Sequence, residues 1–171
     1  MTVIYVLSRH GFDDVMRKAQ IDDSCVEKVD AMFISILTST AVPAGNFHEP
    51  VFKEPHPNVI TLTFDDVMED TTQSVGIDAD GNPFIFKTGQ CFTEDQADQL
   101  LDFFEANQDK YTAFIHCAAG ISRSGAVGAF LSDIRNNSWE LFKRINPKVH
   151  PNPHVLRTLK ERYNYRQNEN S

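Results

Sequence analysis

Two side chains in the second half of the chain, Cys117 and Arg123, have the types and the spacing that phosphate chemistry requires. A cysteine supplies a sulfur nucleophile, and an arginine supplies a planar guanidinium that can donate hydrogen bonds to two phosphate oxygens at once. The residues between them are uncharged and include a glycine, so the segment can curl tightly: Ala118, Ala119, Gly120, Ile121 and Ser122. The segment therefore predicts a loop that binds a phosphate group through Arg123 and the backbone N–H groups.

Two regular elements must position this loop. The apolar run from Tyr111 to Ile115 predicts a buried strand, and the mostly apolar run from Ser124 to Arg135 predicts a helix. A loop between them lies at the carboxyl end of the strand, where open α/β sheets bind ligands, and the helix N-terminus adds partial positive charge. We expect a dianion to be held there with little help from other side chains.

The same surroundings act on the thiol of Cys117. A helix N-terminus and a neighbouring arginine lower the pKa of a cysteine, so we expect a thiolate at neutral pH, with the Ser124 hydroxyl donating to the sulfur. The alternative is a buried structural cysteine that ends a strand. His116 precedes the cysteine on the strand and points to the opposite face, so we expect it to hydrogen-bond the loop and not to act as a general base.

The segment from His116 to Gly125 resembles the signature loop of the cysteine-dependent protein tyrosine phosphatases, in particular their compact dual-specificity-like branch. The segment from Pro151 to Leu156 is similar to the start of the last helix in many of these enzymes. The resemblance covers roughly Val59 to the C-terminus and is weakest between residues 67 and 90. It implies a phosphocysteine intermediate, no cofactor, and an aspartic acid on an upstream loop that protonates the leaving group.

The predicted strand from Val59 to Phe64 runs into two carboxylates, Asp65 and Asp66. In similar dual-specificity-like phosphatases the acid follows an upstream strand, and this local pattern places it at Asp66, with Asp65 as the second candidate. The pair could also cap a turn without a catalytic role. If neither residue is the acid, the next candidates are Asp70, Asp78 and Asp80.

The whole sequence predicts a single α/β domain over residues 1–171, with a mostly parallel sheet flanked by helices. Further signals are consistent with this class: apolar runs typical of strands at 2–7 and 31–37, loosely helical spacing from Phe12 to Lys28, a capping box at Thr93 and Gln96, and an N-cap at Asn152 followed by Pro153. An Asp-Gly turn between apolar flanks predicts an inserted β-hairpin near 74–87.

Two irregular segments have open roles. The proline-containing loop from Thr38 to Asn58 leaves a strand at its carboxyl end, so Phe47 or Phe52 either lines the substrate pocket or fixes the loop to the core. The hairpin turn at 78–82 imitates the start of a calcium-binding loop, but Pro83 stands where glycine is required, so we expect no metal.

The composition indicates which cellular compartment and which binding partners to expect. Three irregularly spaced cysteines argue against a disulfide framework and for a reducing, cytoplasmic location, with Cys25 and Cys91 structural or, less favoured, able to form a reversible disulfide with Cys117. The apolar run at residues 1–7 lacks the basic flank of a signal peptide. A net charge of −8 disfavours nucleic acid and anionic membranes as partners.

The sequence therefore predicts hydrolysis of phosphotyrosine, with phosphoserine and phosphothreonine also open, and a phosphorylated protein or peptide as the partner. Phosphoinositide phosphatases and RNA 5′-phosphatases use related loops, but lipid phosphatases usually carry lysines inside the loop, and this loop has none. A phosphate-binding pseudophosphatase and a redox sensor built on Cys117 are the alternatives outside this class of enzyme. The oligomeric state is not predicted.

Overall fold

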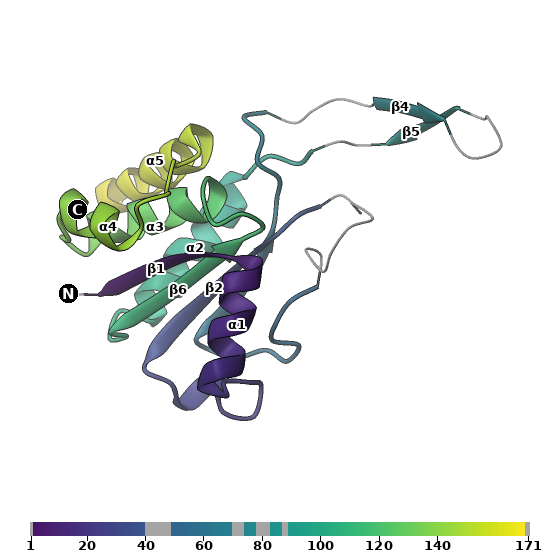
Figure 1. Ribbon diagram of the computed structural model, residues 1–171. Coiled ribbons are helices and arrows are strands. Elements are labelled where there is room, and N and C mark those ends of the chain that lie inside the picture. Colours follow the sequence, from purple (N-terminus) through teal and green to yellow (C-terminus); the bar gives the residue numbers. More distant parts are fainter. Residues whose placement is uncertain (1, 40–48, 70–73, 78–82, 87–88, 170–171) are drawn as a thin grey trace.

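Four strands, all parallel, build the central sheet in the order β1-β6-β2-β3 (Figure 1). The computed structural model describes residues 2–39, 49–69, 74–77, 83–86 and 89–169. The strands of the sheet are β1 Val3–Ser8, β2 Ala31–Leu37, β3 Val59–Thr63 and β6 Thr112–Cys117. Ser8 is in register with Cys117, and Ser35 with His116, so the carboxyl ends of the strands gather at one edge of the sheet.

Helices cover both faces of this sheet, as the sequence predicted (Figure 1). On one face lie the helix α1 Arg9–Ala19 and the short 3₁₀-helix η1 Val26–Lys28. On the other face lie α2 Glu94–Ala106, α3 Arg123–Ile134, α4 Trp139–Ile145 and α5 Pro153–Glu169. The predicted α/β class with a parallel sheet is confirmed.

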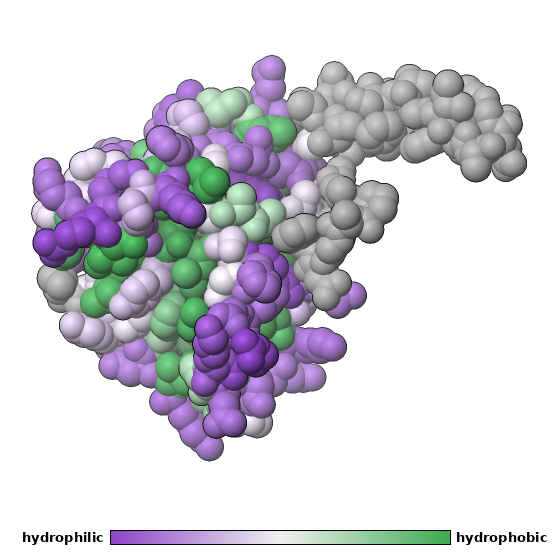
Figure 2. All heavy atoms as spheres, in the orientation of Figure 1, coloured by the Kyte–Doolittle hydropathy of each residue, from purple (hydrophilic) through white to green (hydrophobic). Residues whose placement is uncertain are grey.

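The buried side chains form one apolar cluster on each face of the sheet. The larger cluster joins the sheet to α2, α3, α4 and α5, and α3 contributes an almost unbroken run of buried residues. The smaller cluster joins β2 to α1 and η1. Every residue of β2 is buried, which explains why its sequence is continuously apolar and does not alternate. In Figure 2 apolar side chains also gather between α1 and the helices of the opposite face, where the edge strand β1 runs.

Helix α1 begins earlier than its apolar spacing suggested. We expected helical character from Phe12, but the helix starts at Arg9, directly after β1. The side chain of Ser8 accepts a hydrogen bond from the backbone N–H of Gly11 at 3.1 Å and caps the helix. Because Ser8 pairs with Cys117, the N-terminus of α1 lies beside the end of the strand that carries the cysteine.

Phe52 fixes its loop to the core and does not line a substrate pocket. It is 4% exposed and packs edge-to-face against two other buried aromatic rings, with centroid distances of 6.3 Å to Phe12 and 5.4 Å to Phe33. Burying a phenylalanine contributes about 1.5–3 kcal/mol, and aromatic pairs of this geometry add to it. This result decides between the two roles left open for Phe52; Phe47, the other candidate, lies outside the described residues.

The predicted hairpin is present as a separate antiparallel pair, β4 Ser74–Ile77 and β5 Pro83–Phe86. Its turn at 78–82 lies outside the described residues, as does Asp70, so the structure does not test Asp70, Asp78 or Asp80 as acids or ligands. Within the described residues, no group of three or more His, Cys, Asp or Glu side chains is arranged so that it could hold a metal ion, and no helix is long and apolar enough to cross a membrane.

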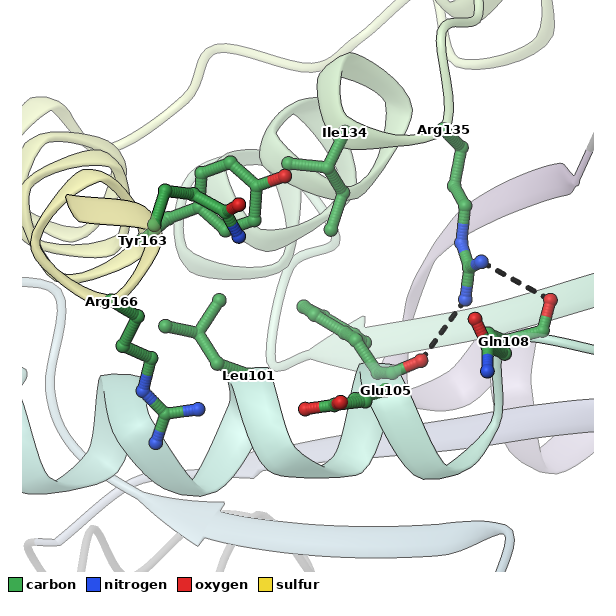
Figure 3. A pocket seen from close by; sticks show the side chains of 9 residues that line it. Leu101, Glu105, Gln108, Ile134, Arg135, Tyr163 and Arg166 are labelled. Carbon is green, nitrogen blue, oxygen red and sulfur yellow. Dashed lines mark hydrogen bonds between the residues drawn. The ribbon is translucent and has the colours of Figure 1, made fainter. Parts of the chain in front are cut away.

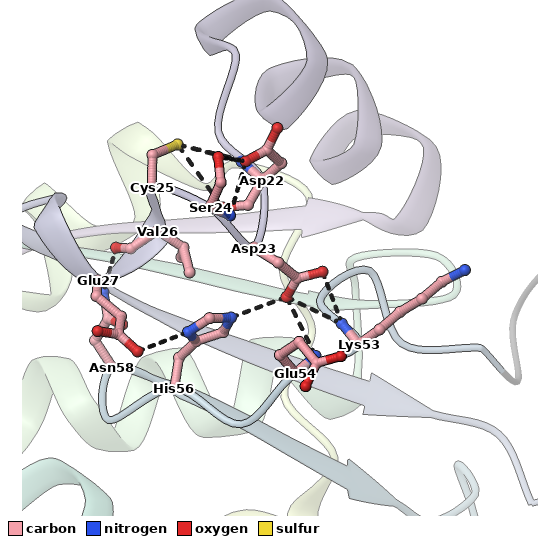
Figure 4. A network of polar contacts seen from close by, with 10 residues as sticks. All are labelled: Asp22, Asp23, Ser24, Cys25, Val26, Glu27, Lys53, Glu54, His56 and Asn58. Atoms are coloured by element: carbon pink, nitrogen blue, oxygen red, sulfur yellow. Dashed lines mark hydrogen bonds and ion pairs between the residues drawn. The ribbon is translucent and has the colours of Figure 1, made fainter.

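A histidine between two carboxylates holds the end of the proline-containing loop (Figure 4). His56 Nδ1 lies 2.9 Å from Glu27 Oε1, and His56 Nε2 lies 2.9 Å from Asp23 Oδ1. The carboxylates of Glu27 and Asp23 accept hydrogen bonds from the protonated ring of His56, and this raises the pKa of His56 above its ordinary 6.5. Asp23 also accepts from the backbone N–H of Lys53 and Glu54, so this cluster connects the loop to the residues around η1.

This cluster predicts a pH dependence of stability with a defined sign. The folded-state pKa of His56 is raised, so its stabilisation is complete below the unfolded pKa and is lost as pH rises through the folded pKa. As the pH rises from the unfolded-state pKa of His56 to its folded-state pKa, we expect the melting temperature of the wild type to fall more steeply than that of His56→Gln. His10→Gln, which changes an exposed histidine, is the matched control. Melting curves from about pH 5 to about pH 9 test the prediction; parallel profiles for wild type and His56→Gln would contradict it.

Candidate active site

The predicted phosphate loop connects the end of β6 at Cys117 to the start of α3 at Arg123. Gly120 has φ +71°, and a Cβ atom there would lie 2.3 Å from the backbone nitrogen of Ser8 and 2.4 Å from the carbonyl carbon of Leu7. Only glycine fits this position, because the conflict is with backbone that cannot rotate away. The loop is thus pressed against the junction of β1 and α1.

A second contact seats the loop on the same junction. The backbone N–H of Arg9, at the start of α1, donates to the carbonyl of Ala118 at 3.1 Å. From the sequence we expected only one helix N-terminus, that of α3, to lie beside the loop. The structure adds the N-terminus of α1, which the early start of that helix places there.

Cys117 is almost fully buried, 2% exposed, and hydrogen-bond donors of its own loop surround its sulfur. The Ser124 hydroxyl lies 3.1 Å from Sγ, and the backbone N–H of Gly120 donates to Sγ at 3.3 Å. Burial alone raises the pKa of the Cys117 thiol, but the Ser124 hydroxyl, the backbone N–H groups of Ser124 and Gly120 and the charge of Arg123 outweigh it, so the pKa lies below its ordinary 9.0. This environment favours a thiolate over the inert structural cysteine.

Arg123 is buried, 6% exposed, and one end of its guanidinium is anchored at the carboxyl edge of the sheet. Nη1 donates to the carbonyl of Phe64 at 2.7 Å and to the carbonyl of Leu37 at 3.3 Å. Nη2 makes only a long contact of 3.4 Å with the Thr38 hydroxyl, and Nε has no partner in the described part of the chain. Because the guanidinium is anchored through Nη1, its Nε and Nη2 remain available to donate to an anion.

The two candidate acids have different surroundings. Asp65 is 5% exposed and accepts three hydrogen bonds, from the backbone N–H groups of Ser39 at 3.0 Å and Gln90 at 2.8 Å and from the Ser39 hydroxyl. Its carboxylate joins two loops far apart in the sequence. Asp66 is exposed and reaches the phosphate loop instead, so Asp66 is the one placed to meet a substrate.

Asp66 is held over the loop by two donors that meet the same oxygen. The hydroxyl of Ser122 and the side-chain amide of Asn152 both donate to Asp66 Oδ1 at 2.7 Å. Asn152 also donates from its backbone N–H to the carbonyl of Ser122 at 3.1 Å and caps α5 by accepting from Val155 N–H at 3.1 Å. The helix cap at Asn152 was predicted from the sequence, but the contacts of Asn152 with Asp66 and with the loop were not.

These contacts predict that Ser122→Ala misplaces Asp66 without unfolding the protein. Within the described residues the Ser122 hydroxyl bonds only Asp66, so the melting temperature should stay unchanged. Ser122 is one of the two donors that fix Oδ1 of Asp66, so kcat on phosphotyrosine should fall roughly tenfold if Asp66 acts there, which is part of the 10²–10⁴-fold that general acid catalysis supplies. The same change in an Asp66→Asn background should have little further effect; equal losses in both backgrounds would show that Ser122 acts independently of Asp66.

His116 has the predicted orientation but a different partner. Its ring lies against Phe12 of α1, on the face of the sheet opposite to the cysteine, with centroids 4.3 Å apart. Nε2 lies 2.9 Å from the Ser35 hydroxyl on β2, so the principal partner of the ring is on the neighbouring strand, and the ring interacts with the loop backbone at Cys117, where the loop begins. Burial and the charge of Arg9 lower the pKa of His116 to about 3, which keeps the ring neutral and unsuited to general-base chemistry.

The remaining cysteines occupy separate places. Cys25 lies on the turn before η1, toward the amino ends of the strands, and its sulfur contacts the carbonyl of Gln20 at 3.4 Å. Cys25 therefore cannot meet Cys117, whose strand ends at the other edge. Cys91 follows Gln90, which is bonded to Asp65, and it remains the only described cysteine on the loop side.

Comparisons with known proteins identify the fold. No protein-family model and no curated protein sequence matches the chain. Among solved structures, a human tyrosine phosphatase-like serine/threonine/tyrosine-interacting protein is similar over 96% of this chain and 87% of that chain, with a TM-score of 0.50 and 15% identity. The PTP-2 phosphatase of Cydia pomonella is similar over 94% of this chain and 86% of that chain, with a TM-score of 0.51 and 16% identity. The chain therefore has the fold of the cysteine-dependent protein tyrosine phosphatases.

Proposed function

We propose that this protein is a phosphomonoester hydrolase that acts on phosphotyrosine in proteins through a phosphocysteine intermediate. The observation that carries the proposal is that three groups meet at the phosphate loop, Cys117 and Arg123 from the loop itself and Asp66 from the segment after β3. Cys117 has a lowered thiol pKa, Arg123 contributes its charge to that environment, and Asp66 is hydrogen-bonded to Ser122 of the same loop. A structural cysteine would need none of these partners.

The first displacement uses all three groups. The Cys117 thiolate attacks phosphorus, and the S–P bond forms as the bond from phosphorus to the leaving oxygen breaks. Arg123 donates from Nε and Nη2, and the loop N–H groups donate to the remaining phosphate oxygens, where negative charge accumulates. Asp66 gives its proton to the leaving oxygen. Because Ser122 and Asn152 both donate to Oδ1, we place that proton on Oδ2.

The second displacement regenerates the enzyme. Water attacks the phosphocysteine, the ionised Asp66 accepts a proton from this water, and the S–P bond breaks to release phosphate and the thiolate. The Ser124 hydroxyl, 3.1 Å from Sγ, stabilises the thiolate as it leaves. In this scheme the loop N–H groups and Arg123 supply the charge stabilisation.

The composition of the loop favours an aromatic phosphoester. Ile121, whose side chain is 37% exposed, is an apolar surface within the loop, and the loop carries no lysine that would pair with the further phosphates of an inositol or a nucleotide. Phenolate is also a better leaving group than the alkoxide of serine. Phosphotyrosine is therefore the expected substrate, and a phosphorylated protein or peptide the expected partner.

Phosphate release from matched peptides tests this preference. We expect kcat/KM to be higher on a phosphotyrosine peptide than on phosphoserine and phosphothreonine peptides of the same flanking sequence, and turnover to persist with a chelator present. Phosphoinositide and 5′-triphosphorylated RNA form the other arms of the assay. Equal or higher kcat/KM on phosphoserine, or preferred hydrolysis of the inositol or RNA substrate, would overturn the substrate assignment while leaving the chemistry of Cys117 in place.

A binding function without turnover is the second candidate. The similar human protein is named a phosphatase-like, interacting protein, so the shared fold alone does not distinguish catalysis from binding. A nucleophile and an arginine on the phosphate loop, with an acid hydrogen-bonded to that loop, favour catalysis here. A wild type that binds phosphotyrosine peptide and releases no phosphate would establish the binding function instead.

A further inference from the structure

A cavity of about 450 Å³ lies between α2, α3 and α5 (Figure 3). Its walls are apolar side chains from all three helices: Leu101, Phe104, Ile134 and Tyr163. Its rim is polar, with Glu105 and Gln108 from α2, Arg135 after α3, and Arg166 and Gln167 from α5. A cavity of this volume, lined by both apolar and polar side chains, is of the size that takes a small organic molecule.

The cavity is remote from the proposed active site. It adjoins Ile134, the last residue of α3, whereas Arg123 is the first residue of that helix. Twelve residues of α-helix span about 18 Å, so a molecule in the cavity does not touch the phosphate loop. The inference that follows therefore does not depend on the proposed function.

Arg135 gives the cavity an unusual charge. Nη1 donates to the carbonyl of Gln108 at 3.1 Å and Nη2 to the carbonyl of Phe104 at 3.0 Å, so the guanidinium is fixed against the end of α2 (Figure 3). It forms no salt bridge with any described residue, and its buried Nε has no hydrogen-bond partner. Burial lowers the pKa of Arg135, and the charge of Asp109, which forms no ion pair with it, offsets this effect only in part.

The other charges at the rim are already balanced or exposed. Arg166 donates to Asp98 and Asp102 at 3.1 and 2.7 Å, so its charge is used in joining α5 to α2. Glu105 is exposed and makes no ion pair within the described residues. The fixed and unpaired charge beside the apolar walls is therefore that of Arg135, in a protein whose net charge is −8.

We propose that this cavity binds a small amphipathic carboxylate, with its ring or alkyl body between Leu101, Ile134 and Tyr163 and its carboxylate toward Arg135. Such a ligand places a counter-charge in contact with Arg135, which Asp109 acts on only without contact, and it removes its own apolar surface from water. A neutral ligand of the same shape lacks the charge interaction with Arg135, and a cationic ligand would be repelled by Arg135. Glu105 at the rim opposes the carboxylate and limits the affinity.

Calorimetric titration with naphthylacetate and with the neutral naphthylethanol tests the proposal on the full chain. We expect the acid to bind about tenfold or more tightly than the alcohol, which is the difference that a charge-assisted contact produces. Arg135→Gln should remove this difference, and Arg144→Gln, which changes an exposed arginine on α4, should leave it intact. Equal affinities of acid and alcohol for the wild type, or no detectable binding of the acid, would overturn the proposal.

Two further variants do not depend on the fold surviving the loss of Arg135. Glu105→Gln removes the opposing rim charge and should tighten the acid a few-fold without affecting the alcohol. Gln108→Trp keeps the carbonyl that Arg135 contacts but places a large side chain at the cavity, and should weaken both ligands about tenfold or more. Unchanged affinities in both variants would place the binding elsewhere and overturn the assignment of the cavity.

Discussion

Cys117→Ser is expected to abolish turnover and to leave phosphotyrosine-peptide binding measurable. The loop N–H groups and Arg123 still bind the phosphate, because Gly120 and the Phe64 carbonyl hold them independently of the sulfur. A serine hydroxyl is a far weaker nucleophile than a thiolate whose pKa is lowered by Ser124, Gly120 and Arg123. We expect a loss on the order of 10³-fold or more in kcat, measured as phosphate release, and a Kd close to that of the wild type.

The matched control for this variant is Cys25→Ser. It makes the same chemical change at an exposed turn near the other edge of the sheet and should retain full activity. Residual activity of Cys117→Ser above about one per cent would exclude Cys117 as the nucleophile. Arg123→Ala, by contrast, should weaken both binding and rate, since it removes the group that grips the phosphate oxygens.

Asp66→Asn is expected to show a loss that depends on the leaving group. General acid catalysis typically supplies 10²–10⁴-fold, so kcat on phosphotyrosine should fall by about that factor. An aryl phosphate with a much more acidic phenol leaves without protonation, so the first displacement on that substrate should be much less affected. The basic limb of the pH–rate profile should flatten in this variant, because it reports loss of the proton that the acid must carry. The acidic limb should remain, because it reports ionisation of the Cys117 thiol and of the substrate, with the thiol pKa below its ordinary value.

Asp65→Asn is the matched control for the acid. It changes a neighbouring carboxylate that joins Ser39 to Gln90, so it should lower the melting temperature. It should also reduce kcat on phosphotyrosine and on the aryl phosphate by the same factor. If Asp65→Asn showed the leaving-group dependence and Asp66→Asn did not, the two roles would be exchanged. If neither did, the acid would lie elsewhere, with Asp70, Asp78 and Asp80 as the next candidates.

Much of the scaffold could be predicted from the sequence because its signals are local. β2 was expected at 31–37 and lies there, since a continuous run of apolar residues marks a strand buried on both faces. The capping box at Thr93 and Gln96 and the cap at Asn152 also lie where expected, because each involves residues at most three apart. The phosphate loop belongs to the same group, because its glycine and its flanking elements are consecutive.

The features that were missed or left open depend on contacts between distant residues. Whether Asp65 or Asp66 meets the substrate depends on Ser39 and Gln90, each about 25 residues away, which occupy the carboxylate of Asp65. The partner of His116 is Ser35, which only the pairing of β6 with β2 brings near. No local sequence pattern predicts contacts between such distant residues, because these contacts are set by the order of the strands in the sheet.

The contact between Asn152 and Asp66 could have been found by combining two sequence signals. Asn152 was expected as a helix cap in a segment that resembles the start of the last helix in these phosphatases, and Asp66 was expected as the acid at a strand end. The early start of α1, however, depends on Ser8 acting as a cap at the end of a strand, where a serine is equally compatible with continued β-structure.

Trapping the covalent intermediate tests the central claim most directly. Asp66→Asn should form the phosphocysteine from an aryl phosphate with a good leaving group and hydrolyse it slowly, because the base for the second displacement is missing. Acid quench after mixing with the radiolabelled substrate, followed by proteolysis and mass spectrometry, should yield one labelled peptide, with phosphate on Cys117 and none in the Asp66→Asn, Cys117→Ser double variant. Turnover that continues with no labelled cysteine, or with the label on another residue, would contradict the proposed mechanism.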